Sequence, residues 1–347
     1  MDFILLDCQL RLTSDHPTFS DFITNFSGLQ AGDTSGKKPD IYVNLNLNDN
    51  FQISKNHRKI SRSIWIGNSS VFISEIERFP GLKLEARTES NRLYINAFLS
   101  NKGQRFVKKS ILSVMSNRRH KELQFIGLLY YVIFIPFFYY LERFRSLFLL
   151  HASGIKYHEN GVILSGLGGI GKSTFSLGTL LLKRCSIISD NLLLCDSRKI
   201  YSCPESIALD AESLKMLKEV KSLLVPKDIN FSHNRAWYQV KPEATSFEAI
   251  PKYLFWLQWS NENRVVPLKN ETCVRNLLNI NLLAKELREY YILAAAFDLA
   301  FSSTISPVSF CNKLFNLLSD TDCYILQFRP GNDIKTIFNE TIATIIQ

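Results

Sequence analysis

The first hundred residues alternate between hydrophobic and polar side chains with the two-residue period of β-strands. Val, Ile, Tyr and Phe, which favour strands, fill many of the hydrophobic positions. Turn residues at Gly67-Asn68 and near Ser90-Asn91 divide the two longest runs into hairpins. The pattern predicts a small antiparallel β unit over residues 1–103, with strands in four segments: Phe3–Leu6, Ile41–Leu47, Ser63–Ile76 and Leu82–Leu99.

A helical connection is expected over residues 104–150. Within it, Leu123–Leu141 contains 19 residues without a charge, which is close to the length that spans a bilayer. The segment also contains Pro136 and four tyrosines, and Glu122 and Glu142 bound it closely. We therefore predict a buried helix, kinked at Pro136, and no membrane span.

From His151 onwards, short hydrophobic runs alternate with helical periods. A turn at Glu159-Asn160-Gly161 joins two strands, and the second leads through a glycine-rich loop into a helix at about Ser173–Lys183. This order predicts an α/β domain with a mixed sheet over residues 151–347. The later strands are expected at Ser186–Ser189, Leu192–Cys195, Ile200–Cys203, Tyr253–Trp259 paired with Val265–Leu268, and Cys323–Phe328, and the later helices at about 283–300, 308–319 and 334–345.

Composition narrows the class of protein. Hydrophobic residues make up 46% and charged residues 21%, which is ordinary for a soluble globular chain with a sizeable core. The seven cysteines show no C-x-x-C spacing, and the N-terminus MDFILLDCQL is acidic where a signal peptide is basic. We expect reduced cysteines and a cytoplasmic protein.

The net charge of +9 is uneven, because residues 1–121 carry 18 basic and 11 acidic side chains. The densest basic stretch, Lys102–Lys121, has no accompanying aromatic pattern, so we interpret it as a solvated helix face and expect no nucleic-acid partner. An alternative is that it attracts an acidic peptide. Exposed edge strands of the N-terminal unit would suit capture of an extended substrate segment.

The sequence Gly166-Leu167-Gly168-Gly169-Ile170-Gly171-Lys172-Ser173 matches the phosphate-binding motif G-x-x-x-x-G-K-[ST] at every position. Glycines permit positive φ angles, and the backbone N–H groups can then surround a phosphate at the start of the following helix. Lys172 would bridge the terminal phosphates, and the Ser173 hydroxyl would bind Mg²⁺. The loop, with Thr174 after it, predicts binding of a nucleoside triphosphate with Mg²⁺, but the motif does not give the nucleotide base.

Two aspartates are candidates for the carboxylate of such a site. Asp190 ends the strand that follows the loop helix. We expect that strand to adjoin the loop strand in a β-α-β unit, so the Asp190 side chain should emerge at the same sheet edge as the phosphates. Asp196 follows Leu192–Cys195, but Ser197-Arg198-Lys199 after it indicates a hairpin turn. We favour Asp190. The sequence does not choose among Glu205, Asp210 and Glu212 as a further carboxylate, or establish Arg235 as a phosphate ligand, and His158 and Glu159 are expected in a solvated turn.

These residues carry a resemblance to a known family. HASGIKYHENGVILSGLGGIGKST, followed by IISDNLLL, resembles the catalytic core of HPr kinase/phosphorylase and of HPr-kinase-like serine kinases, which share the phosphoenolpyruvate-carboxykinase-type nucleotide fold. His151 matches the family histidine, and Asp190 matches the first aspartate, which the family uses as catalytic base. Asn191 stands where a second aspartate is usual, and an amide oxygen can still bind Mg²⁺. His151 is either a phosphate contact or a strand histidine that shapes the loop.

The acidic-Ile-Arg-Gly signature of true HPr kinases is absent after Pro204. The layout is more similar to related kinases of peptide-modification and polysaccharide gene clusters. The resemblance implies an ATP- and Mg²⁺-dependent phosphotransferase that acts on a serine-type hydroxyl of a peptide, protein or small molecule. The catalytic residues would be Asp190, Lys172 and His151, and the metal ligands Ser173, Asp190 and Asn191. The alternatives are a regulatory nucleotide-binding module or ATPase without an acceptor, and a nucleotide-binding scaffold. The oligomeric state stays open, a homo-oligomer included.

Overall fold

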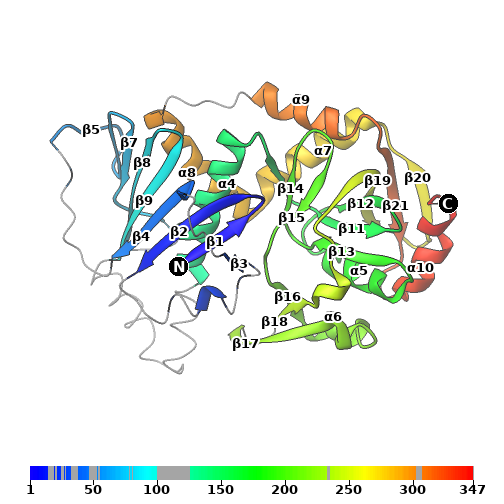
Figure 1. The fold of residues 1–347 in the computed structure, drawn as a ribbon. Helices are drawn as coiled ribbons and strands as arrows, with labels where there is room; N and C mark the ends of the chain where they lie inside the picture. Colours follow the sequence, from blue (N-terminus) through cyan, green and yellow to red (C-terminus); the bar gives the residue numbers. More distant parts are fainter. Residues whose placement is uncertain are drawn as a thin grey trace. The chain divides into compact units, whose positions relative to one another are not determined.

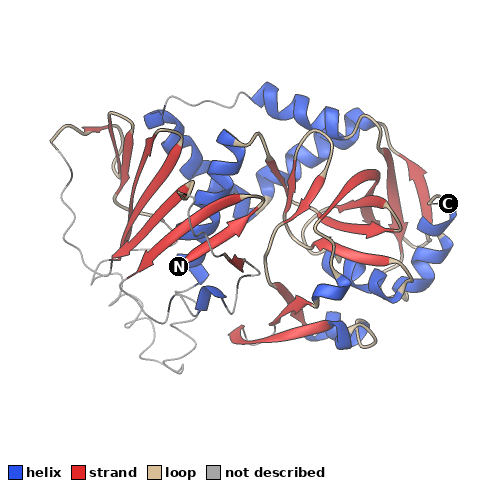
Figure 2. Cartoon of the chain, in the orientation of Figure 1, coloured by secondary structure: helices blue, strands red, loops and turns tan. Residues whose placement is uncertain are grey.

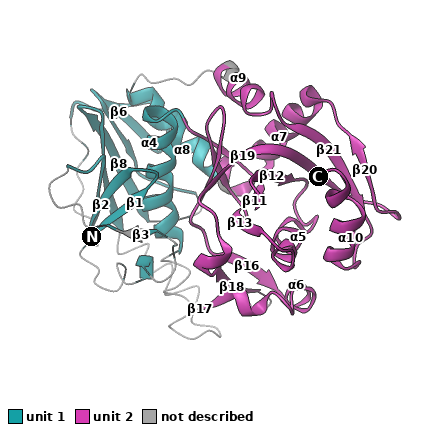
Figure 3. Ribbon diagram, turned by 45° about the vertical axis from the view of Figure 1, so that its right-hand side comes forward, with its two compact units in different colours: residues 1–146, 289–304 teal, residues 147–288, 305–347 magenta. Residues whose placement is uncertain are grey.

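A computed structural model describes residues 1–14, 19, 22–24, 27, 29–32, 38–46, 53, 55–77, 79, 81–99, 126–232, 235–301 and 307–346. The chain forms two compact units (Figure 3). Unit 1 comprises residues 1–146 and 289–304, and unit 2 comprises residues 147–288 and 305–347. The boundaries expected from sequence fell after residues 103 and 150. The helix expected at about 283–300 is present, but its return to unit 1 was not anticipated. The basic stretch Lys102–Lys121 lies outside the described residues.

Unit 1 is built on a nine-stranded sheet whose order is β3-β1-β2-β4-β9-β8-β7-β6-β5 (Figure 1). Hydrophobic side chains alternate along its long strands and are buried on one face. The predicted hairpins are present at β6–β7 and β8–β9. The strands are β1 (Asp2–Leu5), β2 (Cys8–Ser14), β3 (Gln30–Ala31), β4 (Ile41–Asn46), β5 (Arg58–Lys59), β6 (Ile64–Gly67), β7 (Ser70–Ile73), β8 (Leu82–Glu89) and β9 (Arg92–Leu99).

The prediction of a purely antiparallel N-terminal unit was wrong. Strand β4 pairs in parallel with both β2 and β9, so the sheet is mixed. Local alternation fixes which side chains face the core, but it is the same for parallel and antiparallel pairing. The sequence reading also missed β2, because β1 turns into it through Leu6 and Asp7, which adopt positive φ angles without a glycine.

The apolar segment before residue 145 forms the central helix of unit 1. A helix runs over Ile126–Phe144; it contains a π-helical segment, Tyr130–Phe134, followed by α4 (Ile135–Phe144). Pro136 lacks the N–H that would continue the α-helical ladder, and the change of helix type falls just before it. Among the described residues this is the one helix long and apolar enough to cross a membrane, yet 78% of that window is buried within the protein.

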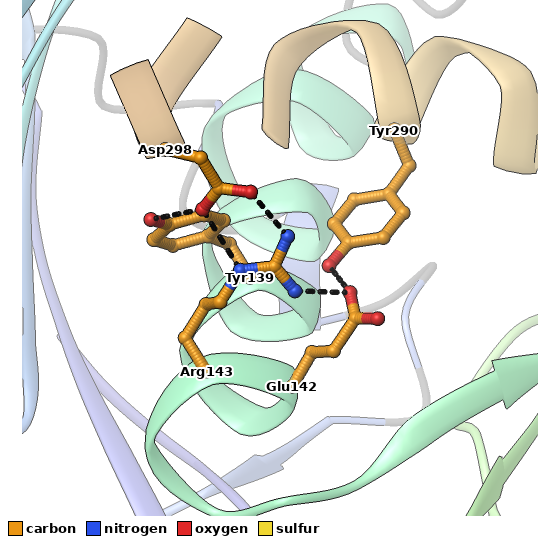
Figure 4. Close-up of polar contacts among 5 residues, drawn as sticks. All are labelled: Tyr139, Glu142, Arg143, Tyr290 and Asp298. Atoms are coloured by element: carbon orange, nitrogen blue, oxygen red, sulfur yellow. Dashed lines mark hydrogen bonds and ion pairs between the residues drawn. The ribbon is translucent and has the colours of Figure 1, made fainter. Parts of the chain in front are cut away.

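A polar network joins α4 to the part of α8 (Lys285–Phe301) that belongs to unit 1 (Figure 4). Arg143 donates to Asp298 through Nε (2.8 Å) and Nη2 (2.6 Å), and Tyr139 donates to the same carboxylate. Glu142 forms an ion pair with Arg143 and accepts from Tyr290. Each carboxylate therefore has an arginine and a tyrosine hydroxyl donor beside it, and Arg143 lies between two carboxylates, which offsets much of the cost of burying these charges.

Unit 2 contains a second nine-stranded sheet. Its main path is β10-β14-β15-β19-β12-β11-β13, and β21 pairs with both β19 and β20. Strand β19 is parallel to β12 on one side and to β21 on the other. The strands are β10 (Phe148–Leu150), β11 (Ser153–Tyr157), β12 (Asn160–Ser165), β13 (Cys185–Ser189), β14 (Leu193–Cys195), β15 (Ile200–Ser202), β19 (Glu248–Trp259), β20 (Arg264–Pro267) and β21 (Asp322–Phe328).

Helices cover both faces of this sheet (Figure 2). On one face, α5 (Lys172–Gly178) and α10 (Ile334–Glu340) pack against Val162 and Leu164. On the other, α7 (Asn270–Leu283) and α9 (Pro307–Leu317) pack against Ile163. Alternate residues of one strand thus enter two hydrophobic cores, which is the α/β arrangement expected from sequence.

Four features of unit 2 differ from the expectations. The predicted pairing of 253–259 with 265–268 was wrong, because β21 lies between β19 and β20. The helix after the loop ends at Gly178, where a side chain would collide with Ile334, and a short 3₁₀ turn follows. Helix α7 was not anticipated. A separate three-stranded sheet, also not anticipated, is formed by β16 (Ile207–Asp210), β18 (Arg235–Val240) and β17 (Leu224–Ser232), with α6 (Ala211–Met216) after β16.

Candidate functional site

The glycine-rich loop connects β12 to α5, as the motif predicts. Gly169 and Gly171 have φ angles of +78° and +95°, which only glycine adopts without strain. A Cβ atom built on either of them, or on Gly168, would meet no other atom within 4 Å, so these residues face open space. Gly166 (φ +152°) instead lies against the Leu257 carbonyl of β19. The loop is therefore anchored at its start and open over its glycines, which leaves room for a phosphate group.

Lys172 places its ammonium group across this loop. Its Nζ donates to the carbonyl oxygens of Gly166 (3.0 Å) and Leu167 (3.3 Å), and the side chain is buried. The ammonium group thus lies beside the backbone amides that would surround a phosphate. This is the arrangement that a bridging lysine needs, since a small reorientation exchanges its carbonyl partners for phosphate oxygens.

Asp190 reaches the same edge of the sheet. It directly follows β13; Ser189 pairs with Gly154 of β11, and Gly154 pairs with Ile163 of β12. Strand β11 lies between β12 and β13, so the carboxylate is two strands away from the loop strand and not on the adjoining strand as expected. Strand β11 forms a hairpin with β12, and β13 then pairs with the other edge of β11.

The carboxylate of Asp190 is held by serine hydroxyl groups. Ser176 donates to its Oδ1 (2.9 Å), Ser153 lies 3.3 Å from the same atom, and Ser173 forms a further side-chain hydrogen bond. Burial, which leaves Asp190 only 9% exposed, raises its pKa, while the serines and Lys172 act in the opposite direction. The contact with Ser173 ties the carboxylate to the residue that the motif assigns to Mg²⁺.

His151 lies between β10 and β11, close to Lys172. Its backbone N–H donates to Oδ1 of Asn281 on α7 (2.8 Å), and Asn281 donates to the carbonyl of Leu149 (2.8 Å). The ring atom Nδ1 is buried, with no hydrogen-bond partner among the described residues. Burial and the charge of Lys172 lower the pKa of His151 to about 4. The imidazole is therefore neutral at physiological pH and has one unused polar atom.

The predicted metal ligands are only partly brought together. Ser173 and Asp190 are in contact, whereas the Asn191 amide donates to Glu205 (3.3 Å). Within the described part of the chain, no group of three or more His, Cys, Asp or Glu side chains could hold a metal ion. A hydroxyl and a carboxylate beside a phosphate loop nevertheless suit Mg²⁺, which is usually held by one or two protein oxygens, phosphate oxygens and waters.

Two other candidates from the sequence, Asp196 and Asp210, have structural roles. Asp196 is a turn residue, as favoured: its carboxylate accepts from the N–H groups of Arg198 and Lys199 and from Tyr201. Tyr201 pairs with Glu248 at the amino end of β19, so Asp196 lies at the opposite sheet edge from the loop.

Asp210 caps α6 by accepting from the N–H of Ser213 (2.7 Å). Thr174, next to the loop lysine and serine, donates to the Ser213 hydroxyl (3.1 Å), so α6 contacts the loop helix. His158 and Glu159 are exposed, as expected for a turn.

Sequence reasoning missed Ser153, Ser176 and Asn281. Two of them carried a local signal: Ser153 lies two positions after His151, and Ser176 lies one helical turn after Ser173. Asn281 carried none, because it is 130 positions from the residue whose backbone it binds.

Comparisons with known proteins show a distant likeness to solved structures. No family model and no curated protein matches the chain. Among solved structures, it is similar to the Hpr(Ser) kinase/phosphatase from Coxiella burnetii, with 12% sequence identity, a TM-score of 0.28, and coverage of 57% of this chain and 90% of that chain. A likeness of this size does not define a function, so the functional conclusion rests on the geometry of the site.

We expect the pH dependence of stability to report on His151. Its pKa is lower in the folded protein (about 4) than in the unfolded chain (about 6.5), so stability should fall as the pH drops from about 6.5 to about 4. The loss due to this group should be at most about 3 kcal/mol. Urea unfolding of the native protein and of His151→Asn at pH 7, 5.5 and 4.5 should give a difference that changes across this window. His158→Asn, at an exposed turn, is the control; an equal pH dependence in all three proteins would contradict the assignment.

Proposed function

We propose that this protein binds Mg²⁺-ATP at Gly166–Thr174 and transfers the γ-phosphoryl group to a hydroxyl group of a peptide, protein or small molecule in the cytoplasm. One observation supports the proposal most directly: the carboxylate of Asp190 contacts Ser173 of the phosphate loop and lies close enough to Lys172 to interact with its charge. A phosphoryl donor site, a metal-binding hydroxyl and a proton acceptor thus meet at one sheet edge.

Each residue has a defined task in this proposal. The loop amides and the Lys172 ammonium group hold the phosphate oxygens and stabilise the charge that develops on them. Mg²⁺, when bound, would supply further charge neutralisation at the phosphates. Asp190 orients the acceptor hydroxyl and takes up its proton; the raised pKa makes it a better proton acceptor than an exposed aspartate. Neutral His151 offers the unpaired Nδ1 without adding charge.

A second function, nucleotide binding or hydrolysis without an acceptor, is favoured by a different observation. Asp190 is only 9% exposed, and three serine hydroxyl groups occupy its oxygens. A carboxylate in that setting is as well suited to holding Ser173 and the metal as it is to deprotonating an alcohol. The version of this function that relies on Asp196 as metal ligand is disfavoured, because that carboxylate is bound in a turn at the other sheet edge.

The recognition of an acceptor by unit 1 also remains a proposal. The sheet of unit 1 ends in β5 on one side, where the exposed residues Arg58 and Lys59 are positively charged. An acidic, extended segment would suit pairing with such an edge.

The proposal is tested by incubating the protein with Mg²⁺ and ATP labelled at the γ-phosphate. The acceptors would be serine-containing peptides, free serine and small polyols, and the products labelled acceptor, inorganic phosphate and ADP. Labelled acceptor, with ADP formed in equal amount and only when an acceptor is present, would support the kinase. Release of inorganic phosphate alone, whatever acceptor is added, would support the second function and overturn the first.

A further inference from the structure

On one side of the phosphate loop, strands β19 and β21 extend beyond the end of β12, the strand that leads into the loop. Ser165, the last residue of β12, pairs with Trp256 of β19. Strand β19 continues for three more residues to Trp259, which pairs with Phe328 of β21. At about 3.3 Å per residue, the two strands project roughly 10 Å beyond the end of β12. They form a wall beside the loop, on the side away from β11 and β13.

Trp259 is the side chain at the end of this wall. Its indole N–H donates to the carbonyl oxygen of Ile170 in the loop (3.1 Å), yet the residue is 55% exposed. A tryptophan this exposed has few packing contacts to fix its orientation. The hydrogen bond to the loop therefore holds the ring in one orientation. Leu167 of the loop is also exposed (59%), so the loop presents a second apolar side chain to solvent.

The site itself gives the direction in which a bound nucleotide would run. Asp190 and Ser173 mark the end that takes the metal and the terminal phosphate, and Asp190 belongs to the β13 side of the loop strand. The nucleoside must leave the loop away from that carboxylate, because the terminal phosphate occupies the space beside it. In open α/β sheets the ligand lies across the carboxyl ends of neighbouring strands. The carboxyl end on the free side is that of β19, where Trp259 lies.

We propose that Trp259 is the stacking platform for the base of the bound nucleotide, with its indole ring oriented by the hydrogen bond to Ile170. The inference rests on the proposed nucleotide binding and adds the residue that holds the nucleoside. Stacking on an aromatic ring tolerates every base, because each base has a π-face. Trp259 should therefore support ATP and GTP to a similar extent and contribute affinity without selecting the base.

The test compares probes with and without a nucleoside. Mg²⁺-ATP, Mg²⁺-GTP and Mg²⁺-tripolyphosphate would be titrated into the native protein, Trp259→Ala, Trp259→Phe and Ile250→Ala by calorimetry. Ile250 is a matched control, since it lies on the same strand at the far end and is 52% exposed. Trp259→Ala should bind ATP and GTP about tenfold more weakly and bind tripolyphosphate as the native protein does. Trp259→Phe should recover most of the loss, and Ile250→Ala should bind all probes normally.

Three results would overturn the inference. An equal loss for ATP and tripolyphosphate in both Trp259 variants would mean that the residue only positions the loop through Ile170. Unchanged affinity of Trp259→Ala for every probe would place the base elsewhere and leave an acceptor contact as the role of the ring. If the native protein bound neither ATP nor tripolyphosphate, the proposed function would fail together with the inference, whereas the first two results leave nucleotide binding intact.

Discussion

Replacing Lys172 by alanine should weaken the binding of Mg²⁺-ATP by about a hundredfold and leave no measurable phosphoryl transfer. The ammonium group lies in the loop, 3.0 Å from the carbonyl oxygen of Gly166, where it can form charged hydrogen bonds to phosphate oxygens. Two such bonds contribute about 3 kcal/mol or more, which corresponds to a factor of at least roughly 100 in affinity. Isothermal titration calorimetry with ATP and with tripolyphosphate would measure the loss, which should be similar for the two probes.

Lys183→Ala is the matched control for this experiment, because Lys183 is exposed and follows the helix and 3₁₀ turn that begin at Lys172. Its charge change is the same, so a purely general effect of net charge on anion binding would appear in both variants. Native affinity in Lys172→Ala would show that the loop does not hold a triphosphate. Thermal unfolding of both variants would establish that each is folded at the temperature of the titration.

The second large effect is expected for Asp190→Asn, which should lower phosphoryl transfer by about a hundredfold or more, since general base catalysis contributes on that scale. Nucleotide affinity should change by only a few-fold, because the loop and Lys172 are untouched. The measurement is the rate of labelled acceptor formation, together with a calorimetric titration of ATP. Asp196→Asn is the control, because this carboxylate belongs to the β14–β15 turn and should not affect transfer.

The Asp190→Asn substitution should lower activity, but it should not lower the stability of the protein at neutral pH. Burial raises the pKa of Asp190 above its ordinary value, so the ionised carboxylate costs folding free energy at neutral pH, and this cost declines as the pH falls and the group takes up a proton. Asparagine keeps the shape without the charge, so Asp190→Asn should be as stable as the native protein at pH 7 or more stable. Its stability relative to the native protein should decrease as the pH falls.

Two outcomes would contradict the role given to Asp190. If Asp190→Asn transferred phosphate at the native rate, the base would have to be another group. If it lost nucleotide binding and transfer together, the carboxylate would act mainly by holding Ser173 and the metal, and the second function would be favoured.

The sequence by itself determined the elements whose signals are local. The complete motif at Gly166–Ser173 predicted a strand, a glycine loop and a helix, because positive φ angles and a helix start depend on adjacent residues. The hairpins at Gly67-Asn68 and Ser90-Asn91 followed from turn chemistry and alternation. Asp190 could be placed at the loop edge and Asp196 in a turn for the same reason: each lies within a few residues of the pattern that fixes it.

The tertiary structure decided which distant segments meet. Periodicity gives the face of a strand but not its neighbour, so the insertion of β11 between β12 and β13, and of β21 between β19 and β20, had no local signal. The same holds for Asn281, which binds the backbone at His151, and for Trp259, which binds Ile170 across 89 positions. Long-range pairing depends on how whole faces of strands and helices bury one another, and a site assembled in that way becomes visible only when the chain is folded.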